Sequence, residues 1–110
     1  MAYNFYVVFV ETSIFTKEIK RLLPDDDYKQ LQTALMLRPD AGDLIGGTGG
    51  LRKIRWKLPY KGKRGSLRVI YYWDKEDTIF MLLPYRKTEK DDLSSAQLKK
   101  LRSLVKENFE

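Results

Sequence analysis

Basic residues gather in one segment of the sequence, where their types and spacing suggest chemistry on a phosphate. Between Leu51 and Lys75 there are nine basic residues and one acidic residue, Asp74, so this window carries a charge of +8 in a chain whose net charge is +6. The nine are Arg52, Lys53, Arg55, Lys57, Lys61, Lys63, Arg64, Arg68 and Lys75. Clustered cations attract polyanions, and an arginine can hold a phosphate through two hydrogen bonds at once. The segment therefore predicts a surface for a nucleic acid or an acidic protein partner.

Alternation along one predicted strand places three of these cations on a common face. Lys53, Arg55 and Lys57 alternate with apolar residues, and side chains two positions apart in a strand point to the same side. Arg68 lies on the strand predicted across the hairpin and joins them if the register allows. Crowded cations lower lysine pKa values, so that a neutral lysine can accept a proton while a charged neighbour donates one. Periodicity alone favours the simpler interpretation, a surface that binds backbone phosphates without cutting them.

Residue types that the chain lacks exclude several other reactions. There is no histidine and no cysteine, which removes the usual general base, the thiolate nucleophile and the common zinc ligands. Without histidine the serines cannot form a Ser-His-Asp triad, and the acidic residues form no recognisable metal-binding pair. The glycine-rich run at positions 46–50 has no Gly-Lys-Ser/Thr sequence of the kind that a phosphate-binding loop needs. We therefore expect neither a cofactor nor a metal.

A strand and two helices are predicted in the first half of the chain. The run 3–10 is rich in valine and aromatic residues and predicts a buried strand. Thr12 or Ser13 can cap the helix that follows. Pro24 separates this helix from a second one, which ends at Pro39.

Three strands and a last helix are predicted in the second half. A loop at 40–50 leads into the strands, and a polar loop at 85–92 leads from them into the helix, where Ser94 and Gln97 form a capping box. The three strands span residues 51–58, 67–73 and 78–84, with a basic hairpin loop at 59–65 and a turn at 74–77.

The order strand, two helices, three strands, helix predicts an α+β fold. We expect one domain over residues 1–110, with one mostly antiparallel sheet and the helices packed on one of its faces. The apolar run 5–10 is too short for a signal core or a membrane span. The expected location is the cytoplasm.

Four short runs in the basic half of the chain form a joint pattern. They are Gly50-Leu51-Arg52-Lys53-Ile54-Arg55, Gly62-Lys63-Arg64-Gly65, Arg68-Val69-Ile70-Tyr71-Tyr72 and Tyr85-Arg86-Lys87-Thr88-Glu89. The run Phe9-Val10-Glu11-Thr12 and the run Asp92-Leu93-Ser94 before the final helix agree with it. Each run is weak alone, but together they span nearly the whole chain. The joint pattern resembles the RelE/ParE superfamily, and most closely its HigB-type toxins.

The resemblance implies the toxin of a type II toxin–antitoxin system, acting as a ribosome-dependent endoribonuclease. In such enzymes the 2′-hydroxyl of the messenger attacks the adjacent phosphate, without a metal, and leaves a 2′,3′-cyclic phosphate and a 5′-hydroxyl. The implied partners are the ribosome, messenger RNA and a cognate antitoxin, which we expect to be HigA-like with a DNA-binding helix-turn-helix. Operator DNA would be reached only through the antitoxin, and no membrane is involved.

Position by position, the resemblance implies a catalytic set of Lys53, Arg55, Arg68 and Lys87. Lys53 and Arg55 match a basic pair on the first meander strand, and Lys53 is the better base because arginine stays protonated. Arg68 matches an arginine that stabilises charge at phosphorus, and Lys87 is placed to stabilise or protonate the leaving oxygen. The residues implied to bind RNA are Arg52, Lys57, Lys61, Lys63, Arg64, Tyr85 and Arg86. Tyr85 is expected in a loop, where it can stack on a base.

Some relatives carry an arginine where this chain has Thr88, and a tyrosine or histidine where it has Leu93 to Ser95, so the general acid is not identified.

Two other functions stay open at this point. A ParE-like toxin shares the fold but inhibits DNA gyrase, and the retained cations at 53, 55 and 68 argue against it. A non-catalytic nucleic-acid-binding module would use the same basic face and would show salt-sensitive binding without cleavage.

Overall fold

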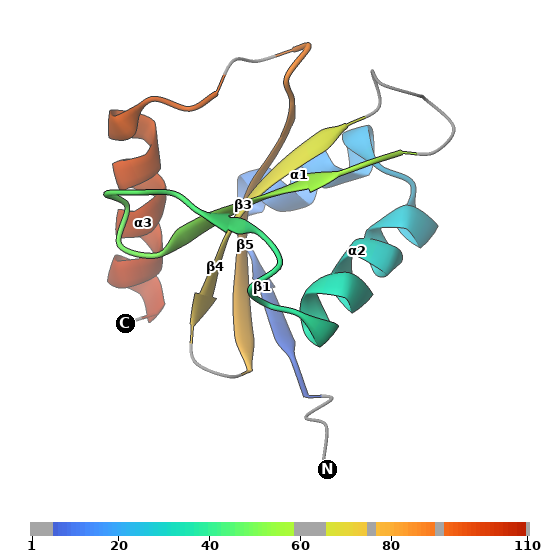
Figure 1. Cartoon of the computed structure of the whole chain (residues 1–110), viewed down its shortest axis with the longest axis horizontal. Coiled ribbons are helices and arrows are strands. Elements are labelled where there is room, and N and C mark those ends of the chain that lie inside the picture. Colours follow the sequence, from blue (N-terminus) through green and yellow to red (C-terminus); the bar gives the residue numbers. More distant parts are fainter. Residues whose placement is uncertain (1–5, 59–65, 75–76, 90–91, 110) are drawn as a thin grey trace.

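The chain folds into one five-stranded sheet with three helices, and the computed structural model describes residues 6–58, 66–74, 77–89 and 92–109. The elements are β1 (Val8–Glu11), α1 (Ser13–Leu22), α2 (Asp25–Leu37), β2 (Asp43–Leu44), β3 (Leu51–Trp56), β4 (Leu67–Asp74), β5 (Thr78–Arg86) and α3 (Ser95–Phe109). The strand order is β1-β5-β4-β3-β2 (Figure 1). β1 runs parallel to β5, and all other neighbours are antiparallel. The predicted α+β class and mostly antiparallel sheet are confirmed.

Local sequence signals define where the helices begin. The side chain of Thr12 accepts a hydrogen bond of 3.0 Å from the backbone N–H of Phe15 and caps α1. Pro24 precedes α2, whose first turn holds three aspartates that interact favourably with the positive end of the helix dipole. Ser94 and Gln97 bind each other's backbone N–H groups through their side chains, at 2.9 and 3.2 Å. The predicted capping box is confirmed.

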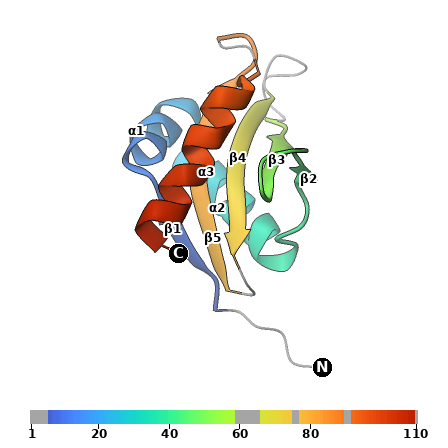
Figure 2. The same cartoon turned by 90° about the vertical axis from the view of Figure 1, so that its left-hand side faces the viewer.

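The helices cover both faces of the sheet, which corrects the prediction that they pack on one. α1 and α2 cover one face, where Phe15 and Leu35 pack with Tyr71 of β4. α3 covers the other face, where Val105 belongs to the same buried cluster as Ile70 of β4. Figure 1 shows α2 and α3 on opposite sides of the sheet, and Figure 2 shows α3 lying across it. The reason is that β4 and β5 are apolar at both odd and even positions, so a single helix layer would leave half of these side chains exposed.

The strands differ from the prediction in several bounds and in one added strand. β1 begins at Val8, β3 ends at Trp56 and β4 ends at Asp74, where 3–10, 51–58 and 67–73 were predicted. Within the predicted loop at 40–50, the two residues of β2 pair with β3 and form a short edge strand. β5 extends two residues further than predicted, because Tyr85 and Arg86 still pair with Arg68 and Leu67 of β4. The predicted polar loop at 85–92 therefore begins only after Arg86.

A buried tyrosine anchors the connection between α2 and β3. The Tyr71 hydroxyl donates to the carbonyl oxygen of Pro39 at 2.7 Å and accepts from the N–H of Gly42 at 2.8 Å. A Cβ atom at Gly42 would lie 2.7 Å from the Tyr71 ring, so this close approach requires glycine. The anchor holds the segment that carries β2 against β3, the strand from which Lys53 and Arg55 project.

Candidate functional site

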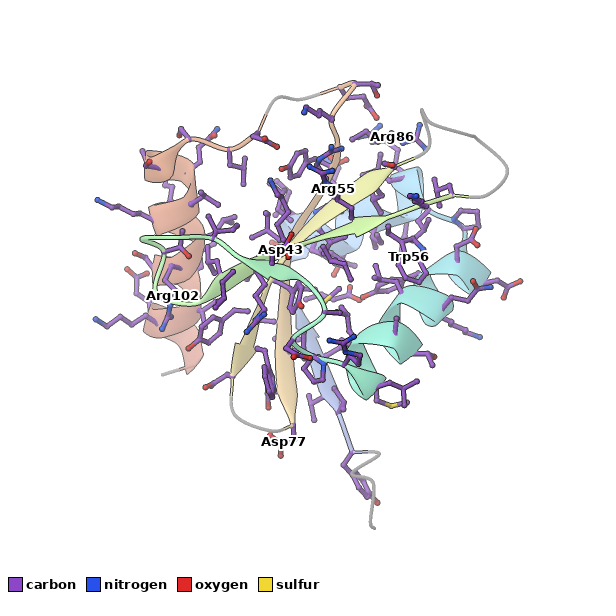
Figure 3. All side chains as sticks on the ribbon, in the orientation of Figure 1. Asp43, Arg55, Trp56, Asp77, Arg86 and Arg102 are labelled. Atoms are coloured by element: carbon purple, nitrogen blue, oxygen red, sulfur yellow. The ribbon has the colours of Figure 1, made fainter. Side chains whose placement is uncertain are left out.

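Arg68 lies at the centre of the candidate site. It is directly opposite Arg55 in the pairing of β3 with β4 and opposite Tyr85 in the pairing of β4 with β5. It lies two residues before Ile70, so its side chain points to the α3 side of the sheet. Figure 3 labels Arg55 toward the end of the sheet that is away from Asp77.

The guanidinium of Arg68 is buried and incompletely satisfied. The residue is only 7% exposed, and its Nε has no hydrogen-bond partner among the described residues. Buried charged groups are normally paired and hydrogen-bonded. An anion that entered between Arg68 and Arg55 would supply both a counter-charge and hydrogen-bond acceptors.

A carboxylate connects this pair of arginines to the segment before α3. The hydroxyl of Tyr85 donates to Oδ1 of Asp92 at 3.0 Å, and Nζ of Lys53 lies 3.8 Å from the same oxygen. Burial, followed by the hydrogen bond to Asp92, raises the pKa of Tyr85 to about 12. The hydrogen bond from Tyr85, followed by the nearby charge of Lys53, lowers the pKa of Asp92. Asp92 therefore stays ionised among cations, and Tyr85 stays a hydrogen-bond donor at neutral pH.

The structure brings the four residues predicted to be catalytic to one end of the sheet. Lys53 and Arg55 project from β3 to the α3 side, and Arg68 projects from β4. Lys87 is exposed in the turn after β5, and its charge contributes to the lowered pKa of Asp92. Asp92 was missed as a site residue, because its only sequence signal was its place in the run before the last helix.

Two arginines predicted to bind RNA point to the opposite side of the sheet. Arg52 donates from Nη1 to the carbonyl oxygens of Asp40 at 3.1 Å and Gly42 at 2.8 Å. Arg86 donates from Nη2 to the carbonyl oxygen of Leu22, at the end of α1, at 3.3 Å. Both arginines therefore lie on a different face of the sheet from Lys53, because residues 52 and 86 have the strand parity that faces α1 and α2.

The remaining predicted RNA-binding residues have different outcomes. Tyr85 is not in a loop but in β5, where it is 5% exposed within the α3-side core, so its ring does not offer a free face for stacking. Lys57 is exposed directly after β3, which is compatible with its predicted contact to a phosphate backbone. Lys61, Lys63 and Arg64, like Tyr60, lie outside the described residues.

Two further features concern the described part of the chain as a whole. Within residues 6–58, 66–74, 77–89 and 92–109, no three or more histidine, cysteine, aspartate or glutamate side chains are grouped so that they could hold a metal ion. In the same ranges no helix combines the length and the apolar character needed to cross a bilayer. Among the described residues, the candidate site combines the guanidinium groups of Arg55 and Arg68, the ammonium groups of Lys53 and Lys87, the carboxylate of Asp92 and the phenol of Tyr85.

Comparison with known proteins gives two results. A family model described as the RelE toxin of the RelE/RelB toxin–antitoxin system matches residues 9–110. The fold is also similar to a structure of the E. coli toxin RelE, an arginine-to-alanine double mutant in the free state. That similarity has a TM-score of 0.56 at 16% sequence identity and covers 99% of this chain and 100% of the other. The structural likeness shows the fold, and the match of the family model over nearly all of the sequence shows that this chain belongs to the RelE toxin family.

Proposed function

We propose that this chain is a ribosome-dependent endoribonuclease that cuts messenger RNA. In the proposed reaction the 2′-hydroxyl oxygen of one nucleotide attacks the adjacent phosphorus, and the bond from phosphorus to the 5′-oxygen of the next nucleotide breaks. The 2′-hydroxyl loses its proton and the departing 5′-oxygen gains one, which leaves a 2′,3′-cyclic phosphate and a 5′-hydroxyl. DNA lacks the 2′-hydroxyl nucleophile and is expected to resist cleavage. Membership of the RelE family supports the proposal, since RelE family toxins are generally ribonucleases.

The observation that carries the proposal is the buried, partly unsatisfied guanidinium of Arg68 directly opposite Arg55. Like charges at opposed positions destabilise a sheet, and a buried polar group without a partner costs about 1–3 kcal/mol. A phosphodiester between the two guanidiniums would relieve both penalties. The transition state carries more negative charge than the bound diester, so it would gain more, which is the condition for catalysis.

The other side chains fit supporting roles in this reaction. Lys53 is the candidate to assist loss of the 2′-hydroxyl proton: its ammonium group, 3.8 Å from Oδ1 of Asp92, would stabilise the negative charge that develops on the 2′-oxygen as the proton passes to water. Lys87 is exposed at the same end of the sheet and is the candidate to protonate or stabilise the leaving 5′-oxygen. Tyr85 holds Asp92 through its hydrogen bond, so it serves the site by positioning and not by stacking.

The proposal extends to partners and location. RelE toxins pair with an antitoxin and act on the ribosome. For this chain we propose a cytoplasmic toxin neutralised by a HigA-like antitoxin, which would bind operator DNA on behalf of the pair. Assignment to the HigB-type branch stays a prediction, because it rests on the sequence resemblance.

The proposal is tested by cleavage of a defined messenger in a purified translation system, with and without ribosomes, followed by mapping of the 3′ ends. We expect cuts only on translating ribosomes, with cyclic phosphate ends, and no cut where the attacking 2′-hydroxyl is replaced by hydrogen. Arg38→Ala is a control for the loss of one positive charge from the protein, since this side chain is 73% exposed at the end of α2. It should cleave like the unmodified chain.

Two results would overturn the proposal. Intact messenger together with arrested growth would indicate the gyrase-inhibiting branch of the superfamily. Intact messenger together with normal growth and salt-sensitive RNA binding would indicate a binding module.

A further inference from the structure

The turn that follows β5 is fastened to α1 by ion pairs in which Glu89 contacts both Arg21 and Arg86. Backbone hydrogen bonding from the N–H of Glu89 to the carbonyl oxygen of Arg86, at 3.0 Å, closes the turn. Oε2 of Glu89 accepts a hydrogen bond of 2.9 Å from Nη1 of Arg21 in α1. Oε1 of Glu89 lies 3.9 Å from Nε of Arg86, whose Nη2 in turn binds the carbonyl oxygen of Leu22. Glu89 therefore connects the end of β5 to the end of α1.

The same turn carries Lys87, which directly follows the end of β5, where Tyr85 pairs with Arg68 of β4. Glu89 contacts α1, whereas the charge of Lys87 acts on Asp92, which is bound to Tyr85 on the α3 side. Glu89 is thus held on the α1 side, two residues along the turn from Lys87, and Lys87 lies at the end of the strand pair that carries Arg68. Fastening Glu89 limits the positions that Lys87 can take.

We propose that Glu89 is a positioning residue that holds the turn so that the ammonium group of Lys87 faces the Arg68 site. The proposal rests on the proposed function, in which Lys87 acts on the leaving oxygen. Glu89 touches neither the phosphate nor the reacting atoms, and it acts only through the position of Lys87. Arg86, which does not face the site, has the same role, because it contacts both Glu89 and the carbonyl oxygen of Leu22.

The expected effect is modest because the contacts are partly exposed. The side chains of Arg21 and Glu89 are 56% and 43% exposed, and ion pairs of this kind are weak. Proton transfer nevertheless depends on alignment to within about 1 Å. We expect Glu89→Ala to lower kcat about threefold to fivefold with KM unchanged.

The matched control is Glu18→Ala. Glu18 binds the same arginine, Nε of Arg21, at 2.9 Å but lies within α1 and holds no part of the turn. It should leave kcat unchanged. In a Lys87→Ala background, Glu89→Ala should produce no further loss of kcat, since a residue that acts through Lys87 has nothing left to position. Full additivity of the two changes would overturn the proposal.

An NMR titration of the Asp92 carboxyl tests the position of Lys87 without an activity measurement. If Glu89→Ala releases the turn, Lys87 moves away and the pKa of Asp92 rises. The loss of the Glu89 negative charge would by itself have the opposite effect, because removing a nearby negative charge lowers the pKa of Asp92. A rise with Glu89→Ala and none with Glu18→Ala supports the proposal, whereas an unchanged or lowered pKa overturns it. If the unmodified chain cuts no messenger, the proposed function fails, and this titration alone decides whether Glu89 positions Lys87.

Discussion

Replacement of Arg68 by methionine separates a residue that serves a reaction from one that serves the fold. Methionine retains an unbranched apolar side chain of similar reach but removes the guanidinium. Arg68 is 7% exposed, its Nε lacks a partner among the described residues, and Arg55 lies directly across the strand pair. These facts predict that Arg68→Met changes stability and activity in opposite directions.

The magnitudes follow from the same contacts. Relieving a buried unsatisfied donor and an opposed like charge is worth about 1–3 kcal/mol, reduced by the packing that methionine does not reproduce. A net gain of about 1 kcal/mol would raise the Tm of a domain of this size by roughly 3–6 °C. Loss of a positioned donor to the transition state lowers kcat by about 10²–10³-fold.

The assay combines thermal unfolding with single-turnover cleavage on translating ribosomes, for Arg68→Met and for the exposed control Arg38→Met. Arg68→Met should unfold at a higher temperature than the unmodified chain and cut far more slowly, while the control changes neither value appreciably. A variant that lost stability and activity in parallel would refute the reasoning, because Arg68 would then be a structural residue. Full activity in a stably folded variant would refute it as well.

Three further predictions concern groups around the site. Tyr85→Phe removes the hydrogen bond that lowers the pKa of Asp92, so NMR titration should show this pKa rising. A carboxyl group whose pKa is lowered in the folded state stabilises the fold at a pH above its unfolded pKa, and this stabilisation is lost as the pH falls through the folded pKa. The variant should therefore lose less stability in acid than the unmodified chain, and an unchanged acid profile would contradict this. Arg102→Ala removes a guanidinium 4.3 Å from the ring centroid of Tyr72 together with a 3.1 Å bond to a glycine carbonyl, so urea unfolding should show a loss of about 1 kcal/mol, and no loss would count against the contact. Arg52→Ala should lower stability by about 1–2 kcal/mol yet leave the salt dependence of RNA binding unchanged, whereas a smaller salt slope would return this residue to the RNA-binding surface.

Much of the fold was predictable because its signals are local. Thr12 and the Ser94–Gln97 pair act on backbone groups within three residues, so their capping could be predicted without knowing the rest of the chain. The alternation around Lys53 and Arg55 likewise defines two strand faces from neighbouring residues alone. The side of the sheet chosen by α3 was predicted wrongly, since it depends on the apolar positions of β4 and β5, which are distant in sequence.

The candidate site shows the same division. Lys53, Arg55 and Arg68 were predicted to share a face, and their strand parity placed them together. The same parity directed Arg52 and Arg86 to the opposite side, which a count of positive charges could not indicate. Asp92 and the burial of Tyr85 depend on how the segment before α3 returns to β5, and no local pattern encodes that return.

From the sequence alone follow the types of the elements other than β2, the clustering of basic residues and the lack of histidine and cysteine, because these depend on composition or on short-range periodicity. The family resemblance rests on its short motifs. The folded structure adds that the helices lie on both faces, that Arg68 is buried opposite Arg55, that Asp92 binds Tyr85 and that Glu89 binds Arg21. Burial and charge pairing are properties of neighbours in space. They are set when strands and helices that are far apart in the chain pack together.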